Sequence, residues 1–196
     1  MKNTNTNNSN RPVVTGIVRF SYCHVFEPKA VQGDEVSKYS ICIMIPKSDT
    51  MTVTKIKTAI QNAYENGQAT LKGNGRSVPA FSVIRNPLRD GDTERPDDPA
   101  FAGCYFLNAT SRFKPGIVDQ DLNSIIDRME FYSGCYGRAS LGFYAYSFNG
   151  NRGIACGLNN LQKLKDGEPM GGRTTAAMDF GDADDDSDDA VADFLN

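Results

Sequence analysis

Residues 136–150, with the sequence YGRASLGFYAYSFNG, restrict the fold of this chain more than any other stretch. Alternate residues of a β-strand point to opposite faces, so the stretch divides into two interleaved sets. One set is small or apolar and suits a core: Cys135, Gly137, Ala139, Leu141, Phe143 and Ala145. The other carries aromatic rings and a cation: Tyr136, Arg138, Tyr144, Tyr146 and Phe148. The pattern predicts a strand with one buried face and one face of exposed rings.

The pair Asn149-Gly150 closes this stretch and indicates a tight turn, because both residues tolerate positive φ. The segment RGIACGL, residues 152–158, is therefore expected to pair back as the second strand of a hairpin. An exposed aromatic patch usually marks a binding site. The alternative is a strand covered on both faces, as in a sandwich core, and the stretch alone does not choose between the two.

The other predicted elements are mostly strands. Residues 13–26 and 101–110 are rich in β-branched and aromatic residues. Residues 38–47 alternate, with Tyr39, Ile41, Ile43 and Ile45 on one face. Apolar residues at helical spacing from Val53 to Tyr64 predict a helix that Ser48 or Asp49 can cap and Gly67 can end. The segment LNNLQKLKDG, residues 158–167, is expected to form one or two helical turns. Five strands, one middle helix and long loops favour a mainly β protein with an OB-fold, a five-stranded Greek-key barrel.

The chain length and composition indicate one folded domain. With 196 residues, of which 39% are hydrophobic, the chain can bury one core. Residues 1–10, MKNTNTNNSN, are polar and are expected to be disordered, and residues 11–178 form the predicted domain. No stretch approaches the roughly 20 apolar residues of a membrane span, and no signal peptide is recognisable. A cytoplasmic location is therefore expected.

The cysteines and the single histidine indicate neither a metal site nor catalysis. Five cysteines without close spacing, and an odd count without a secretion signal, suggest reduced thiols; they are Cys23, Cys42, Cys104, Cys135 and Cys156. His24 is adjacent to Cys23, but neighbouring strand residues point to opposite faces. Buried small hydrophobes are the expected role of these cysteines, so no catalytic residue, metal or cofactor is predicted.

The charges are distributed unevenly along the chain. Residues 179–196, DFGDADDDSDDAVADFLN, contain eight acidic and no basic residues. With those eight set aside, 16 acidic residues remain against all 21 basic ones, a net charge of +5 for residues 1–178. Such an acidic run is expected to be disordered and to serve as an interaction tail, although it could act only as a solubility appendage. The expected partner-binding residues are Asp184, Asp185, Asp186, Asp188, Asp189, Asp193, Phe194 and Leu195.

Basic residues occur in loops that could lie next to the predicted aromatic strand of residues 136–148. They are Lys72 and Arg76 in LKGNGRSV, Arg112 and Lys114 around Phe113, and Arg138 and Arg152 in the hairpin. Cations that follow phosphates, together with rings that stack on bases, form the usual site for single-stranded nucleic acid of any sequence. These residues, with Tyr136, Tyr144, Tyr146 and Phe148, are the predicted binding site.

Residues 130–180 resemble the C-terminal half of phage-encoded single-stranded-DNA-binding proteins with an OB-fold. The segments GCYGRAS, NGNRGIACGLNN and KLKDGEP carry this similarity, together with the earlier NPLRDGD. The resemblance implies a protein that coats single-stranded DNA during phage replication, recombination and repair, in the cytoplasm of an infected bacterium and without catalysis. It also implies that the tail recruits replication proteins such as a DNA polymerase or helicase. In this chain Leu195 and Asn196 follow Phe194, which is a departure from tails that end in the aromatic residue.

Further hypotheses concern the tail and two other functions. A tethered polyanion can compete with DNA for a cationic groove at an effective concentration of about millimolar. Self-association is a further expectation. Alternatively, a carboxylate cluster could hold Mg²⁺ for nuclease chemistry, or could be only a solvated loop; it comprises Asp90, Asp92, Glu94, Asp97 and Asp98. A virion or scaffold protein without affinity for nucleic acid is the third possibility.

Overall fold

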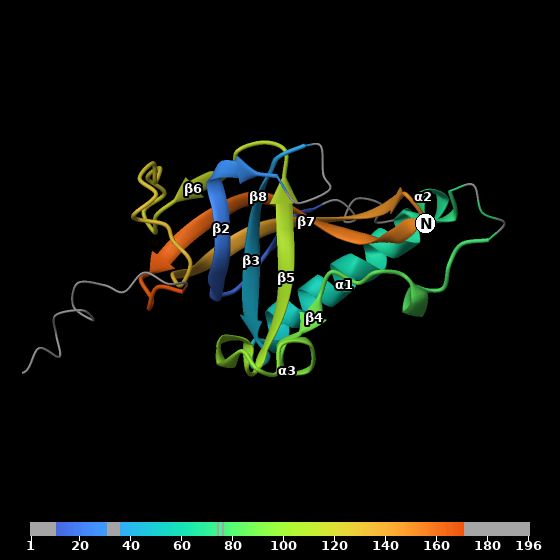
Figure 1. Cartoon of the computed structure of the whole chain (residues 1–196), viewed down its shortest axis with the longest axis horizontal. Coiled ribbons are helices and arrows are strands. Elements are labelled where there is room, and N and C mark those ends of the chain that lie inside the picture. Colours follow the sequence, from blue (N-terminus) through green and yellow to red (C-terminus); the bar gives the residue numbers. More distant parts are fainter. Residues whose placement is uncertain (1–10, 31–35, 74, 76, 171–196) are drawn as a thin grey trace, which may run out of the picture.

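The fold is seen in a computed structural model that describes residues 11–30, 36–73, 75 and 77–170. Five long strands form its centre (Figure 1): β2 (Val18–Lys29), β3 (Lys38–Pro46), β5 (Cys104–Ser111), β7 (Tyr136–Phe148) and β8 (Asn151–Lys165). Neighbours pair in the order β7-β2-β3-β5-β8, and β8 pairs again with β7, which closes the barrel. The β5–β8 pair is parallel and the other pairs of the barrel are antiparallel. The predicted five-stranded OB-fold barrel is confirmed.

Short strands extend the edges of this barrel into an eight-stranded sheet. Strand β1 (Val13–Val14) pairs with β7, β4 (Arg89–Asp90) pairs with β5, and β6 (Gly116–Val118) pairs in parallel with β8. The connection between β4 and β5 contains α3 (Gly91–Glu94) and the 3-10 turn η2 (Pro99–Phe101). It covers part of the outer face of β3 and β5, where Cys42, Met44, Phe101 and Phe106 form a small buried cluster.

The middle helix α1 (Thr50–Asn66) follows β3 and runs diagonally toward the tip of the β7–β8 hairpin (Figure 1). Its cap is Asp49, whose carboxylate accepts a hydrogen bond from the Thr52 amide at 3.0 Å, and it ends at Gly67, as predicted. A short helix α2 (Gln68–Lys72) continues it, and the 3-10 turn η1 (Phe81–Val83) follows. The buried side chains of α1, among them Ile56 and Ile60, pack against the barrel core.

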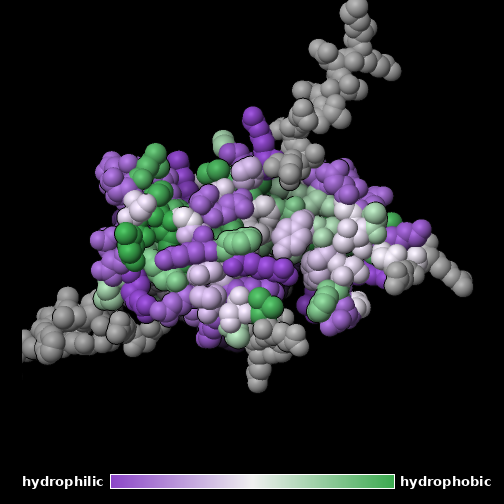
Figure 2. All heavy atoms as spheres, turned by 90° about the horizontal axis from the view of Figure 1, so that it is seen from above, coloured by the Kyte–Doolittle hydropathy of each residue, from purple (hydrophilic) through white to green (hydrophobic). Residues whose placement is uncertain are grey.

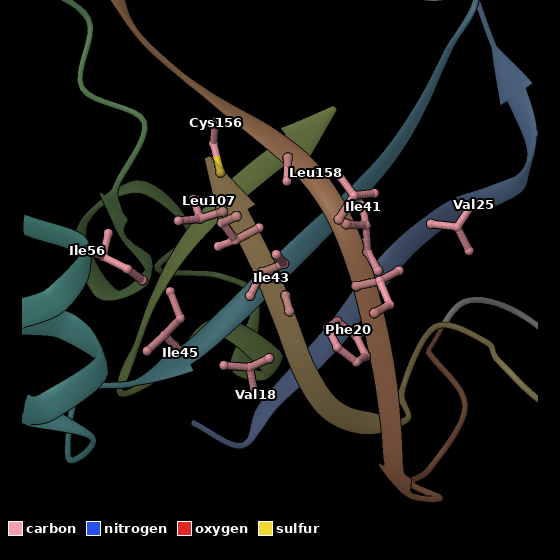
Figure 3. Close-up of a cluster of buried hydrophobic side chains, with 14 of the residues drawn as sticks. Val18, Phe20, Val25, Ile41, Ile43, Ile45, Ile56, Leu107, Cys156 and Leu158 are labelled. Carbon is pink, nitrogen blue, oxygen red and sulfur yellow. The ribbon is translucent and has the colours of Figure 1, made fainter. Parts of the chain in front are cut away.

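Inward-facing residues of the barrel strands fill the core. Figure 3 shows Phe20 of β2, Ile41 and Ile43 of β3, Leu107 of β5 and Cys156 of β8 pointing toward one another. All of these side chains are at most 3% exposed. Burial of apolar area at about 25 cal/mol per Å² makes this cluster the main source of stability, and it leaves the outer faces of the strands for other roles.

Two sequence-based expectations about secondary structure were wrong. The predicted first strand, 13–26, is interrupted at residues 15–17. There the buried Thr15 hydroxyl accepts a hydrogen bond from the Ala139 amide at 3.0 Å, and the Gly16 amide donates to the Thr52 hydroxyl at 2.8 Å. These two contacts hold the segment against β7 and α1 in place of a continuous strand.

The second error concerns residues 158–165, which belong to β8 and not to a helix. A bulge causes the misleading pattern: Leu158 pairs with Leu141 and Asn160 with Ser140, so Asn159 is an extra residue. Leu158 and Leu161 therefore both face the core although they are three residues apart. That spacing is also typical of a helix.

The five cysteines are free thiols, in agreement with the sequence-based expectation. Cys42, Cys135 and Cys156 are buried, and Cys23 and Cys104 are partly buried. Burial raises the pKa of the Cys23 thiol to about 12 and that of Cys42 to about 11. These thiols are therefore protonated at neutral pH and pack as hydrophobes. Among the described helices none is both long and apolar enough to cross a membrane.

Candidate nucleic-acid interface

The predicted alternation of the β7–β8 hairpin is confirmed. Gly137, Ala139 and Leu141 are buried, whereas Tyr144 and Phe148 are 51% and 69% exposed. Asn149 and Gly150 have φ values of 47° and 79°, as the tight turn requires. The hairpin thus presents its ring-bearing face outward, and the reading of β7 as a strand covered on both faces is wrong.

A row of outward-facing residues crosses the barrel, one residue on each strand, and four of the five are small. His24 of β2 is paired with Ser40 of β3, Ser40 with Thr110 of β5, Thr110 with Gly157 of β8, and Gly157 with Gly142 of β7. We call these five residues the cross-sheet row. At the usual strand spacing of about 4.8 Å, its four steps span about 19 Å. Because the members on β3, β5, β8 and β7 have short side chains or none, a flexible chain can lie close to the backbone over this part of the sheet.

The two glycines of the row leave an open floor beside Tyr144. A Cβ added to Gly142 would have no described atom within 4 Å. A Cβ added to Gly157 would lie 3.5 Å from Cε1 of Tyr144, so the Tyr144 ring lies next to this floor. A half-exposed ring beside an open, flat surface can stack on a planar group such as a base.

A second aromatic residue lies at the opposite end of the cross-sheet row, where Tyr22 occupies a β-bulge of β2. The pairing with β3 shifts between Ser21 and His24. Tyr22 has a φ of 49° and is 54% exposed. A non-glycine residue in the left-handed region is strained, and such strain often occurs at functional sites. The sequence-based prediction missed Tyr22 because a bulge changes the face to which a residue points.

Two hollows lie beside the tyrosines of β7. Tyr146 borders a hollow of about 670 Å³ that is also lined by Arg85, Asn86, Arg89 and Asn108. Tyr144 borders a groove of about 660 Å³ between β7 and α1, which we call the α1 groove. The sequence-based site list omitted Arg85 and Asn108; the position of Arg85 just before the NPLRDGD segment was the only available signal.

Three of the predicted residues lie near the tip of the hairpin. Phe148 ends β7, Arg152 is the second residue of β8, and Lys72 ends α2. A Cβ added to Gly73 would lie 3.4 Å from Oγ of Ser147 and 3.9 Å from Nη2 of Arg152, which places the end of α2 beside the hairpin. Because Arg152 is paired with Ser147, its side chain lies on the face of Ser147, whereas Tyr146 and Phe148 point to the opposite face of the hairpin.

The remaining predicted residues lie elsewhere on the barrel. Arg112, Phe113 and Lys114 follow β5; Phe113 is 81% exposed, and Nζ of Lys114 lies 5.8 Å from the centroid of the Phe26 ring. Tyr136 and Arg138 begin β7, and Tyr136 precedes Tyr144 by eight residues, or about 26 Å along a strand. The guanidinium of Arg19 lies 5.5 Å from the Tyr136 ring centroid. The predicted rings of β7 thus do not form one continuous patch.

Several cations on these surfaces are available for an anionic ligand. Within the described residues, no carboxylate forms a salt bridge with any of Lys72, Arg112, Lys114, Arg138 and Arg152. Arg76 lies outside the described residues. So do the predicted partner-binding residues of the tail: Asp184, Asp185, Asp186, Asp188, Asp189, Asp193, Phe194 and Leu195.

Four of the five carboxylates of residues 90–98 have structural partners. Nζ of Lys47 lies 2.7 Å from both Asp90 and Asp92, and Asp92 also accepts a hydrogen bond from the Gly103 amide at 2.8 Å. Lys47 and this amide lower the pKa of Asp92. Glu94 pairs with Arg89 at 3.5 Å, and Asp98 caps the following 3-10 turn. Across the described ranges, no three His, Cys, Asp or Glu residues are grouped as a metal ion would require.

Comparisons with known proteins agree with the fold. The chain is similar to the single-stranded DNA-binding protein of bacteriophage Enc34 in its complex with ssDNA, with a TM-score of 0.69, 24% identity, and coverage of 81% of this chain and 88% of that one. It is also similar to gp2.5, a single-stranded DNA-binding protein encoded by bacteriophage T7, with a TM-score of 0.59 and 12% identity over 86% and 99% of the two chains.

A sequence relative and a family model extend this result. Putative protein p50 of Acyrthosiphon pisum secondary endosymbiont phage 1 is 31% identical over 173 residues, which cover 84% of this chain and 90% of that protein. The family model described as Enterobacter phage Enc34, ssDNA-binding protein, matches residues 11–191. The chain therefore belongs to the family of the Enc34 phage ssDNA-binding protein.

Proposed function

We propose that this protein binds single-stranded DNA across the outer face of its barrel, largely without sequence preference and without catalysis. The observation that carries this proposal is the cross-sheet row, whose members on β3, β5, β8 and β7 are small and which has a half-exposed tyrosine near each end, Tyr22 on β2 and Tyr144 on β7. OB-folds commonly bind oligonucleotides on the face of their second and third strands, which here are β3 and β5. Family membership supports the same ligand.

The proposed contacts divide into rings and cations. Tyr144, Tyr146 and Phe148 stack on bases, and Lys72 and Arg152 contact phosphates near the hairpin tip. Phosphate contacts from the other predicted residues extend the site along the barrel: Arg76, Arg112, Lys114 and Arg138, with Phe113 and Tyr136 as further rings. Stacking and phosphate contacts do not depend on base identity, which is the physical reason for the proposed lack of sequence preference.

Fluorescence anisotropy of a labelled single-stranded oligonucleotide tests this function. Duplex DNA and RNA of equal length serve as competitors across a salt series. We expect strand-selective binding whose log affinity falls with log salt by about 0.7 for each phosphate neutralised. Absence of binding at low salt, with or without residues 179–196, would remove the proposal. Cleavage of the oligonucleotide on addition of Mg²⁺ would instead indicate a nuclease.

In the phage life cycle, we propose that the protein coats strands exposed during replication, recombination and repair in the cytoplasm of the infected bacterium. The acidic tail is proposed to recruit replication proteins, such as a DNA polymerase or helicase, and to compete with DNA for the cationic surface. Support comes from the opposite charges of the tail and the remaining chain, and from the apolar residues near the end of the tail.

Deletion of residues 179–196 is expected to tighten binding to single-stranded DNA several-fold at low salt, because a tethered polyanion no longer occupies the site. The gain should shrink at high salt, where charges are screened. A control with the tail aspartates replaced by asparagine keeps the length of the tail and should behave like the deletion. Equal affinities of all three proteins at low salt would contradict the competition.

Self-association is a further proposal, and the connection between β6 and β7 supports it. Leu122, Ile126 and Met129 are 71%, 82% and 65% exposed, and hydrophobic residues gather at one end of the face in Figure 2. The turn is ordered, since Asp119 accepts hydrogen bonds from the Asp121 and Asn123 amides, both at 2.8 Å. Acidic residues around the patch suit the basic surface of a second copy.

Leu122 allows this self-association to be tested without loss of folding. Its φ of 67° is strained for leucine and comfortable for glycine. Leu122→Gly is therefore expected to keep or raise the thermal midpoint while it lowers association. Sedimentation velocity should show a coefficient that rises with concentration for the wild-type protein but less for the variant. Identical concentration dependence in the two proteins would exclude this patch as the contact.

A further inference from the structure

The α1 groove continues from the end of the cross-sheet row. Gly142 and Tyr144, where the row ends on β7, also line this groove. Strand β1 pairs with β7 only at Ser140 and Leu141. Beyond that point, the edge of β7 away from β8 faces α1 across a space of about 660 Å³. A chain that follows the row past β7 therefore enters the groove directly.

The lining of the α1 groove suits a nucleotide strand. Lys55, Thr58 and Asn62 come from α1, Arg11 comes from the segment before β1, and Tyr144 borders the groove from the hairpin. Lys55 is exposed and has no carboxylate within salt-bridge distance among the described residues. Asp49, whose pKa is lowered by hydrogen bonds from Thr52 and also by the charge of Lys55, is already engaged as the cap of α1. Two cations with hydroxyl and amide groups can bind phosphate and sugar.

We propose that the single strand leaves the sheet over β7 and continues into the α1 groove, where Lys55 contacts a phosphate and Asn62 contacts the same nucleotide segment. This inference rests on the proposed DNA-binding function and adds a subsite on the helix side of the barrel. The face of β3 and β5 binds the first part of the strand, and the α1 groove binds the part that extends beyond β7.

Oligonucleotide length separates the two parts of this site. Binding is measured for oligothymidylates from about 4 to 16 nucleotides, the range of site sizes found for OB-folds. Lys55→Ala should match the wild-type protein on the shortest oligonucleotides that bind. On longer ones it should lose affinity, and its salt slope should be smaller by about 0.7, the contribution of one phosphate contact. Asn62→Ala should show the same length dependence without the change of slope.

Lys57→Ala is the matched control, because Lys57 is exposed on the same helix but does not line the groove. Its Nζ lies 5.3 Å from the Tyr105 ring centroid, and two residues along a helix correspond to a turn of about 200°. Lys57→Ala should follow the wild-type protein at every length. Equal behaviour of the two lysine variants would overturn the groove subsite while DNA binding by the barrel face remains. Absence of wild-type binding at every length would remove the proposed function itself.

The same titrations show whether the phosphate bound in the α1 groove belongs to the strand on the barrel face or to a second strand. A strand that continues from the row gives one oligonucleotide per protein once the oligonucleotide is long enough to fill both parts of the site. Two long oligonucleotides per protein, reduced to one by Lys55→Ala, would show a separate second strand in the groove and would overturn the continuous path.

Discussion

Replacement of both Tyr144 and Tyr146 by leucine is expected to weaken binding to single-stranded DNA by about 30-fold or more. Each ring that stacks on a base contributes about 1 to 3 kcal/mol, and every 1.4 kcal/mol is a factor of ten in affinity. The thermal midpoint should change little, because Tyr144 is 51% exposed and Tyr146 borders an open hollow. Leucine keeps an apolar side chain on the strand but has no face for stacking.

Phe81→Leu is the control for this double variant. Phe81 is also exposed, but its ring packs edge-to-face on Tyr64 of α1, with centroids 5.3 Å apart. We expect it to leave DNA affinity unchanged in the anisotropy titration. If the double variant loses thermal stability and keeps its affinity, the tyrosines are structural residues and the site lies elsewhere.

Two glycines of β7 are expected to respond in opposite ways to substitution. A Cβ at Gly137 would lie 1.9 Å from the carbonyl oxygen of Gln162 and 2.9 Å from the Phe20 ring. Gly137→Ala should therefore destabilise the protein by about 3 kcal/mol or more, the upper range of overpacking effects. Denaturant unfolding should show a lower midpoint, because the β7–β8 ladder must separate to admit one methyl group.

Gly142→Val is the counterpart, since no described atom would lie within 4 Å of the new Cβ. A β-branched residue suits a strand, so the unfolding midpoint should be kept or raised. DNA affinity should fall by about tenfold, the size of one lost stacking contact, because the side chain fills the floor beside Tyr144. Undiminished affinity would show that the strand does not approach the backbone at Gly142.

Local patterns in the sequence predicted the elements that depend on neighbouring residues. The alternation of residues 135–148, the Asn149-Gly150 turn and the capping of α1 by Asp49 and Gly67 all follow from short-range chemistry. The helix expected at 158–167 was wrong because the bulge at Asn159 gave a strand the spacing of a helix. A single inserted residue is sufficient to reverse such an interpretation.

The candidate site depends on contacts that local patterns do not contain. The cross-sheet row joins His24, Ser40, Thr110, Gly157 and Gly142, and its existence requires the register of five strands that are distant in sequence. Conversely, the alternation places Tyr136 and Tyr144 on the same face, but the two residues lie far apart along β7. Alternation identifies the face on which a residue lies, and only the pairing of strands identifies its neighbours.

The order in which the barrel closes has a consequence for synthesis on the ribosome. β2 pairs with β7 through Val18 and Gly137, residues that are 119 positions apart in the chain. Strands β2 and β3 are made early, but their barrel is completed only after β7 and β8 have been synthesised. Such long-range pairing slows folding and leaves strand edges exposed in the meantime. During translation, the N-terminal half of the chain therefore exposes strand edges that can pair with other chains until β7 and β8 have been made.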